Sequence, residues 1–233
     1  MARNLCLSCQ RPVKACICAF FCEINNEIPV LVLQHPSEVK QSKGTVALLQ
    51  HSLNFCQVIV GENFTEHTGL NEILTQHQVL LLYPGEQAVD VSLVASFFTQ
   101  KGKIIEKQKP PLLIMLDGTW KKTYRMFMLS KNLHSLSQVC LPDFLANNGQ
   151  YLIRKVAKNN ALSSLEAVCY ALALLEGELT ENGITKKRAV ATKPSINCGR
   201  YQPLLDQFSQ FNQFQLAFIK ASLDENKKAW FCN

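Results

Sequence analysis

The sequence has few charged residues and no long apolar run. Charged side chains make up 18% of the 233 residues and apolar side chains 47%, a balance that excludes an intrinsically disordered chain. No apolar run reaches the ~20 residues of a membrane-spanning helix, and residues 1–12 lack the apolar stretch of a signal peptide. We therefore expect one generous domain, or one domain with a small appendage, that is soluble, unexported and cytoplasmic, with no membrane partner.

The cysteines are not distributed like a disulfide framework. Ten are present, and five of them fall within the first 22 residues. Cys6 and Cys9 are separated by two residues and Cys16 and Cys18 by one, so four soft ligands lie within 13 residues. This spacing suits Zn²⁺ held by four thiolates, and the lack of an open position predicts a structural site. Cys22 is a spare that could replace Cys18; the alternative is a set of reduced, buried thiols.

Positive charge is concentrated in particular segments, although the formal net charge is only +6. Residues 23–100 carry eight acidic and two basic side chains, whereas residues 101–131 carry two acidic and eight basic ones. Residues 183–205 carry five basic side chains and no acidic one. This polarised distribution favours a polyanionic partner, and an ordinary lysine-rich surface is the alternative.

Apolar runs of strand length alternate with stretches of helical periodicity. We expect strands at 28–34, 57–60, 78–83 and 112–116, and helices at 38–53, 90–100, 163–176 and 201–223. Ser163 and Glu166 form a capping box for a helix that is apolar on nearly all sides, and Gly177 ends that helix. The alternation predicts an α/β fold, a mostly parallel sheet with helices on both faces, with any site at the strand-to-helix junctions.

Three short motifs follow expected strands. Residues 35–38 (HPSE) follow the first strand, and residues 82–86 (LYPGE) follow the third, where Pro-Gly makes a tight turn with exposed backbone N–H groups. Residues 117–120 (DGTW) follow the fourth strand and precede a helix. In that motif, the simplest interpretation of Asp117 or Thr119 is a helix N-cap.

The helix that begins after Asp117 is expected to have two distinct faces at 100° per residue. Its aromatic residues share one face, which we expect in the core: Trp120, Tyr124 and Phe127. Its cationic residues occupy a neighbouring arc, which we expect to contact phosphates beside a carboxylate: Lys121, Lys122 and Arg125.

In this order, the motifs resemble those of the DTW domain family, named for the D-x-T-W motif that stands here at residues 117–120. The cysteine cluster, HPSE, Thr45, LYPGE and the LSSLEA segment at 162–167 complete an ordered set over about residues 3–200. Two departures are mild: Ser164 stands where the family usually has Thr, and Lys43-Gly44 precede Thr45 where relatives often have Ser-Asn.

The resemblance implies a tRNA-uridine aminocarboxypropyltransferase, which transfers the 3-amino-3-carboxypropyl group of S-adenosylmethionine to N3 of a tRNA uridine and releases methylthioadenosine. It also implies a SPOUT-like fold, whose sheet can be knotted. We expect a zinc-binding unit at 1–22, an S-adenosylmethionine-binding DTW domain at 23–200, a packed carboxyl-terminal helix at 201–233, and a monomer. The alternatives are a SPOUT-like RNA methyltransferase and a non-catalytic, zinc-containing RNA-binding protein.

The resemblance places the site around the D-x-T-W motif. The expected catalytic residues are Asp117, Thr119 and Trp120, with Asp117 either taking the uridine proton or holding the donor's amino group. The expected cofactor-binding residues are Leu82, Tyr83, Pro84, Gly85, Leu116 and Ser163. The tRNA is expected to lie across Lys121, Lys122, Arg125 and Arg154. The roles of His35 and Glu38 stay open.

Overall fold

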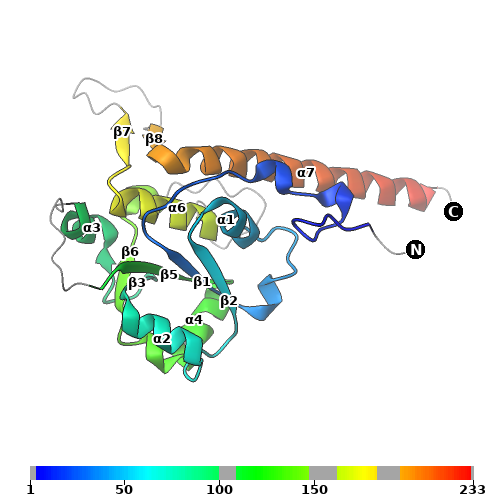
Figure 1. Cartoon of the computed structure of the whole chain (residues 1–233). Helices are drawn as coiled ribbons and strands as arrows, with labels where there is room; N and C mark the ends of the chain where they lie inside the picture. The colour runs from blue at the N-terminus through cyan, green and yellow to red at the C-terminus, as the bar shows by residue number, and fades with distance from the viewer. Residues whose placement is uncertain (1–3, 100–108, 147–161, 183–194, 232–233) are drawn as a thin grey trace.

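A six-stranded parallel sheet forms the centre of the molecule (Figure 1). The computed structural model describes residues 4–99, 109–146, 162–182 and 195–231. The strand order is β2-β1-β5-β3-β6-β4, and every neighbouring pair is parallel. The strands are β1 (Val30–Gln34), β2 (Cys56–Val60), β3 (Gln78–Leu82), β4 (Val89–Asp90), β5 (Pro111–Asp117) and β6 (Ser137–Cys140). The expected parallel α/β sheet is confirmed, and β4 and β6 are short strands that the sequence analysis missed.

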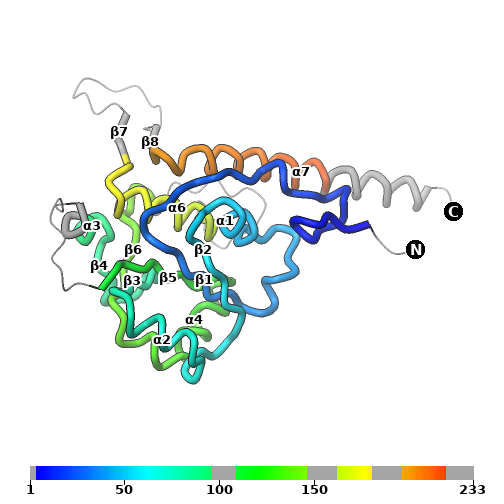
Figure 2. The backbone as a smooth tube through the Cα atoms, viewed as in Figure 1, coloured from blue at the N-terminus to red at the C-terminus, as the bar shows by residue number. Residues whose placement is uncertain are grey.

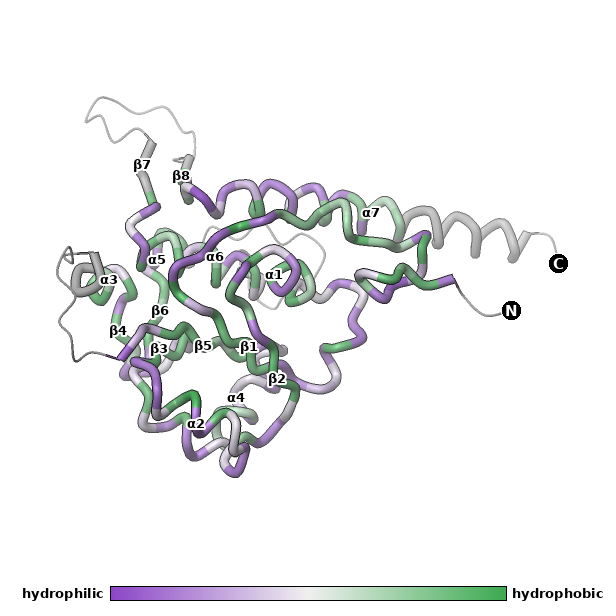
Figure 3. Tube along the Cα trace, in the orientation of Figure 1, coloured by the Kyte–Doolittle hydropathy of each residue, from purple (hydrophilic) through white to green (hydrophobic). Residues whose placement is uncertain are grey.

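Helices cover both faces of the sheet. On one face lie α1 (Val46–Ser52), α3 (Val91–Thr99) and α6 (Ser164–Leu175), and on the other lie α2 (Thr68–Gln76) and α4 (Trp120–Leu129) (Figure 1). The central strands β1, β3 and β5 are buried on both sides, so their apolar residues follow one another without alternating polar residues, and these strands are mainly green in Figure 3. In β1, Val30 and Val32 join the first core, whereas Leu31 and Leu33 join the second.

Helix α6 is the most deeply buried helix of the described part. It begins with the expected capping box: Ser163 accepts from the Glu166 N–H at 3.1 Å, and the Glu166 carboxylate accepts from the Ser163 N–H at 2.7 Å. It is followed by Gly177, whose φ of 71° is favourable only for glycine. The carboxyl-terminal helix α7 (Gln202–Phe231) covers α6 on the side away from the sheet.

Helix α7 buries the apolar residues of its first turns but not a later one. Leu204, Phe208 and Phe211 are at most 1% exposed, whereas Phe218 is 45% exposed. Two 3₁₀ turns of the amino-terminal unit, Val13–Ala15 and Cys18–Phe20, run beside this helix (Figure 2). The Phe20 ring packs against Phe211 and Phe214 of α7, with ring centroids 5.8 and 5.5 Å apart.

The remaining described elements are short. They are the 3₁₀ turns Pro36–Glu38, Lys131–Leu133 and Gly199–Tyr201, helix α5 (Asp143–Ala146), and the antiparallel strands β7 (Thr180–Asn182) and β8 (Ser195–Asn197). No helix in the described ranges is long and apolar enough to cross a membrane.

One expected helix is much shorter than its periodicity suggests. The sequence predicted a helix from Glu38 to Leu53, but α1 begins only at Val46. Between them the backbone makes successive three-residue turns, in which the Glu38, Gln41 and Gly44 N–H groups donate to carbonyls three residues earlier. Pro36 initiates the first turn, and these turns carry the chain along the carboxyl edge of the sheet before α1 begins.

Candidate functional site at the carboxyl edge of the sheet

Asp117 lies at the carboxyl end of β5, directly beside Gln34 at the end of β1. It is 8% exposed, and each of its carboxylate oxygens accepts a hydrogen bond from a neutral side chain. Gln34 Nε2 donates to Oδ2 at 3.0 Å, and Ser164 Oγ donates to Oδ1 at 2.6 Å. A carboxylate offers about four acceptor positions, so these two bonds fix its orientation and leave capacity for a proton or an ammonium group.

The two partners of Asp117 come from distant parts of the chain. Gln34 is the one polar residue of β1 and is 7% exposed, so its amide needs a partner inside the protein. Ser164 is the first residue of α6, where the capping box holds the turn. The family's usual Thr at position 164 would carry the same hydroxyl, so this departure preserves the donor. Gln34 was missed in the sequence, although a glutamine that ends an otherwise apolar strand was the available signal.

The N-cap interpretation of the D-x-T-W motif can now be compared with the geometry. Thr119 is the N-cap residue of α4, but its side chain makes no capping hydrogen bond. The Asp117 carboxylate is directed at β1 and α6. Gly118, between Asp117 and Thr119, is in close contact with its surroundings. A Cβ atom at this position would lie 3.2 Å from Lys122 Cβ and 3.7 Å from His35 Cβ. The motif is therefore a tight crossing from strand to helix with its carboxylate turned toward neighbouring strands.

The HPSE motif and α4 are joined by an ion pair next to Asp117. Glu38 is 5% exposed, and its Oε1 accepts from Lys122 Nζ at 2.7 Å. Lys122 also donates to Ser37 Oγ at 2.6 Å. Lys122, predicted to contact phosphate, is thus engaged with a buried carboxylate, and Glu38 holds the start of α4 against the end of β1.

A second acid links the same two elements at the surface. Glu62 Oε1 lies 3.4 Å from His35 Nε2 and 3.0 Å from Arg125 Nε. The Arg125 side chain is 67% exposed, and Lys121 is also exposed on the same side of α4. Glu62 lies in the polar loop after β2, and nothing in the sequence pattern singled it out. Of the predicted cationic arc, Lys121 and Arg125 face solvent and Lys122 faces the protein.

The aromatic face of α4 is the clearest correction to the sequence analysis. Trp120 and Tyr124, predicted in the core, are 63% and 58% exposed. Helix α4 packs on the sheet through Thr123 and Met126 instead, and Phe127 is only partly buried. A helical wheel gives the angle between side chains but not which side faces the sheet, and the tight crossing at Gly118 turns the helix so that Trp120 points outward.

The residues predicted to bind the cofactor surround the end of β3, next to β5. Leu82 and Leu116 are 9% and 7% exposed and belong to opposite cores, so their side chains serve the packing of the sheet. The Tyr83 ring stacks on Phe127 of α4 at 4.8 Å. Gly85 follows exposed Pro84, and a Cβ atom at Gly85 would collide with the Gln138 amide. The Ser163 side chain is used by the capping box of α6. In the Tyr83–Gly85 turn, the groups left for contact with a ligand are therefore mainly those of the backbone.

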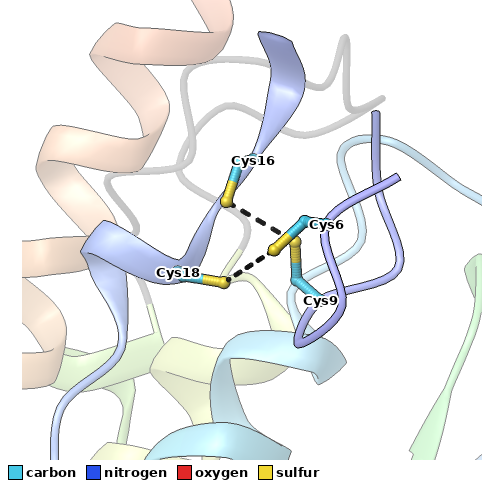
Figure 4. Close-up of side chains that lie close together, drawn as sticks. All are labelled: Cys6, Cys9, Cys16 and Cys18. Atoms are coloured by element: carbon cyan, nitrogen blue, oxygen red, sulfur yellow. Dashed lines mark hydrogen bonds between the residues drawn. The ribbon is translucent and has the colours of Figure 1, made fainter. Parts of the chain in front are cut away.

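The four cysteines predicted to bind metal converge (Figure 4). Their sulfur atoms all lie within 4.8 Å of one another, with Cys6 and Cys18 3.6 Å apart and Cys9 and Cys16 3.8 Å apart. Sulfurs at 2.3 Å from a tetrahedral ion would lie about 3.8 Å apart, so the cluster fits a metal ion. Cys22 lies outside this group; its N–H donates to Ser52 Oγ, and burial raises its thiol pKa.

Backbone amides favour the thiolate form of Cys6, whereas hydrogen bonds with the Cys18 and Cys6 thiols raise the pKa of Cys16 to about 12. The N–H groups of Cys9 and Ser8 are directed at the Cys6 sulfur and lower the pKa of that thiol to about 6. In a cluster that can hold a cation, this preference for the charged form assists coordination.

Arg11 attaches the amino-terminal unit to the segment that precedes α1. Its guanidinium donates a hydrogen bond to the Ser42 carbonyl at 2.6 Å, three residues before Thr45. Arg154, the last predicted RNA contact, lies outside the described residues.

Comparisons with known proteins identify the family of the chain. The DTW domain matches residues 3–216. A Drosophila melanogaster tRNA-uridine aminocarboxypropyltransferase 2 is 33% identical over 181 residues, which are 75% of this chain and 67% of the fly protein. The Macaca fascicularis protein of the same name is 29% identical over 75% of this chain but only 57% of its own length.

An Arabidopsis thaliana tRNA-uridine aminocarboxypropyltransferase A is 27% identical over 75% of this chain and 73% of its own length. No solved structure matches the chain. The match of the family domain to nearly the whole sequence, together with the ordered motifs around Asp117, shows that the chain belongs to the DTW domain family.

Proposed function

We propose that this protein transfers the 3-amino-3-carboxypropyl group of S-adenosylmethionine to N3 of a uridine in tRNA and releases methylthioadenosine. The observation that carries the proposal is the buried Asp117 carboxylate, held by Gln34 and Ser164 at the edge where β1, β5 and α6 meet. The names of the relatives support the same reaction.

The reaction forms a bond between N3 and the side-chain methylene of the donor and breaks the bond between that methylene and sulfur. The electron pair of the broken bond goes to sulfur, and the N3 proton must leave. The sulfonium is already a good leaving group, so the protein has to choose one of three carbons and assist loss of the proton.

In this proposal, Asp117 Oδ1 or Oδ2 accepts the N3 proton or, in the alternative role, holds the donor's ammonium group. Its two hydrogen-bond donors keep the carboxylate at one angle to the strands, which fixes the direction of approach. The turn at Tyr83–Gly85 offers backbone groups close to the same edge, and we propose that it lines the donor pocket with Leu116 and the start of α6.

The remaining predictions belong to the same proposal. We propose a SPOUT-like, knotted arrangement, supported by the parallel sheet and by the return of α6 to the end of β5. The division at residues 22 and 200, the monomeric state and a cytoplasmic location are proposed with it; nine described cysteines are free thiols, which suits a reducing compartment. RNA phosphates are proposed to contact Lys121, Arg125 and Arg154, with Lys122 secondary because of Glu38.

The decisive experiment incubates the protein with S-adenosylmethionine, carrying label in its aminocarboxypropyl carbons, and unmodified tRNA, and identifies both products. We expect labelled aminocarboxypropyluridine and methylthioadenosine, with little transfer by Asp117→Asn. Glu72→Gln, an exposed acid on α2, is the matched control and should retain activity. Adenosylhomocysteine would indicate a methyltransferase instead, and RNA binding without either co-product would indicate a non-catalytic module.

We also propose that Cys6, Cys9, Cys16 and Cys18 hold one structural Zn²⁺. Zinc would supply a fixed cross-link between the two cysteine pairs, because the unit has few buried side chains of its own. Cys9→Ser should reduce the zinc content well below one per chain and make the chain near Arg11 sensitive to protease. The melting temperature of the sheet domain should change less. Cys22→Ser is the control. Zinc-free protein as purified, or disulfides among these sulfurs, would contradict the site.

A further inference from the structure

Helix α4 presents an exposed apolar row beside the proposed site. Trp120, Tyr124 and Met128 are 63%, 58% and 50% exposed, and they recur every four residues, so they lie on one side of the helix. Trp120 is the first residue of α4, three positions after Asp117. The row therefore starts at the carboxyl edge of the sheet and runs away from it across the outer surface.

A cationic row adjoins the apolar one. Lys121 and Arg125 each follow an exposed aromatic residue by one position, and α4 contains no acidic residue. Arg125 is anchored by its Nε contact with Glu62, which fixes the side chain while two-thirds of its surface stays exposed. Flat rings next to positive charges are the combination that binds single-stranded nucleic acid, because rings stack on bases and cations attract phosphates.

Ring contacts beside the row attach α4 to the neighbouring turns. Tyr83, from the proposed donor pocket, stacks on Phe127 with 17° between the ring planes, and Phe127 also contacts the His134 ring at 4.8 Å. His134 Nε2 lies 2.8 Å from the Phe127 carbonyl. Phe127 lies partly buried on the same face of α4 as Trp120 and Tyr124, so these contacts fix the helix directly beside the exposed row.

We propose that Trp120 and Tyr124 form a stacking surface for unpaired RNA bases next to the uridine that is modified. The inference rests on the proposed function and specifies its substrate: a uridine in a single-stranded loop, whose neighbouring bases lie on α4 while their phosphates contact Lys121 and Arg125. Unstacked bases with free faces are found in loops rather than in A-form helices, so a paired stem is excluded from this surface.

A second copy of the chain fits this surface less well. In a two-fold dimer formed through α4, the cationic row of one copy would lie against the same row of the other, and like charges would repel. A polyanion has the complementary charge. Dimerisation is therefore an outcome that the experiment must be able to detect, and RNA is the occupant that the charges favour.

The test uses the fluorescence of Trp120. The sequence has two tryptophans, so Trp230→Phe leaves Trp120 as the only one. We expect a single-stranded oligouridylate to quench this emission, because stacking on a base quenches indole. An abasic oligoribonucleotide of the same length carries the same phosphates without bases and should quench little. A blunt RNA duplex should also quench little.

Affinity measurements separate stacking from charge. Tyr124→Ala should weaken binding of unmodified tRNA about 5- to 100-fold, as expected for loss of base stacking, whereas Tyr124→Phe should bind nearly as the parent does. Phe55→Ala is the matched control, since Phe55 is 53% exposed but lies before β2, at the opposite edge of the sheet. The affinity for S-adenosylmethionine should not change in any of the three variants.

Several results would overturn the inference: equal quenching by the abasic oligomer, unchanged tRNA affinity in Tyr124→Ala, a loss of S-adenosylmethionine affinity, or a parent dimer that Tyr124→Ala converts to monomer. Failure of the proposed reaction is distinguishable. Base-dependent quenching without any transfer product would leave the stacking surface intact and remove the enzymatic assignment. Transfer product without such quenching would do the opposite.

Discussion

Two buried acids at opposite edges of the sheet, Glu176 and Asp117, differ in the groups that hydrogen-bond to their carboxylates. Glu176, at the end of α6, accepts from the Glu27 and Ile28 N–H groups before β1 and from the Tyr201 hydroxyl at 2.5 Å. Arg200 Nη1 lies 3.9 Å from Oε2 of the same carboxylate. Asp117, at the carboxyl edge, accepts only from neutral side chains, and among the described residues no cation pairs with it.

The difference separates an acid that holds the fold together from one that is available for chemistry. Backbone amides, a phenol and a guanidinium together occupy the acceptor positions of Glu176, so nothing further can bind there. Asp117 is oriented but no cation among the described residues pairs with it, and it lies at the carboxyl edge of the sheet beside the end of β1. Substitutions should therefore affect stability at one site and turnover at the other.

The largest effect is expected for Asp117→Asn. The amide keeps the size of the side chain but can neither take a proton nor pair with an ammonium group, so transfer should fall about 100- to 10,000-fold. The melting temperature should change little. Single-turnover assays and thermal denaturation measure the two quantities, and near-normal turnover would show that the carboxylate only supports the structure.

Glu176→Ala should have the reverse signature. It leaves two N–H groups and a buried phenol without their acceptor, which should lower the free energy of unfolding by about 3 kcal/mol. Turnover per folded molecule should stay within about twofold. Glu176→Gln retains an acceptor and should recover part of the stability in denaturant titrations. A large loss of turnover at full folding would end the distinction between the two acids.

A smaller effect is expected for Ser164→Ala, which removes one of the two donors that orient Asp117. We expect turnover to fall about tenfold, comparable to the loss of one hydrogen bond to a charged group, with the donor's KM nearly constant. Ser164→Thr restores the hydroxyl that relatives usually carry and should restore activity. If Thr failed to rescue, the hydroxyl contact seen in the structure would not be the cause.

The smallest effect concerns pH at the amino edge. Arg200 donates to Glu178 and lowers the pKa of that carboxyl below its ordinary 4.5, so the pair stabilises the fold above that pH and the contribution is lost as the pH falls. Because Glu178 is partly exposed, the contribution should be at most about 1 kcal/mol. Glu178→Gln should flatten the acid side of the stability profile; an unchanged profile would show that the pair contributes nothing.

The sequence predicted the features that depend on neighbouring residues. Apolar runs located four of the six strands of the parallel sheet, and the box formed by Ser163 and Glu166 located the start of α6 to within a residue. The spacing of Cys6, Cys9, Cys16 and Cys18 predicted a cluster that the structure brings together.

Features that depend on how whole helices and strands are arranged could not be predicted from the sequence. The pairing of Gln34 with Asp117 follows from the register of β1 against β5, which no local pattern encodes. The orientation of α4 follows from the crossing at Gly118, so the exposed Trp120 was assigned to the core. Glu62 contacts Arg125 only because a loop after β2 passes the start of α4.

The contact of Phe20 with Phe211 and Phe214 has a consequence for the order in which the protein is made. During synthesis, the amino-terminal unit is made long before α7, the helix against which it packs. Until then Phe20 has no ring to pack on, and closing so long a loop is entropically costly. The unit can gather its four cysteines and contact Ser42 early, yet the Phe20 side chain reaches its final packing only after α7 has been made.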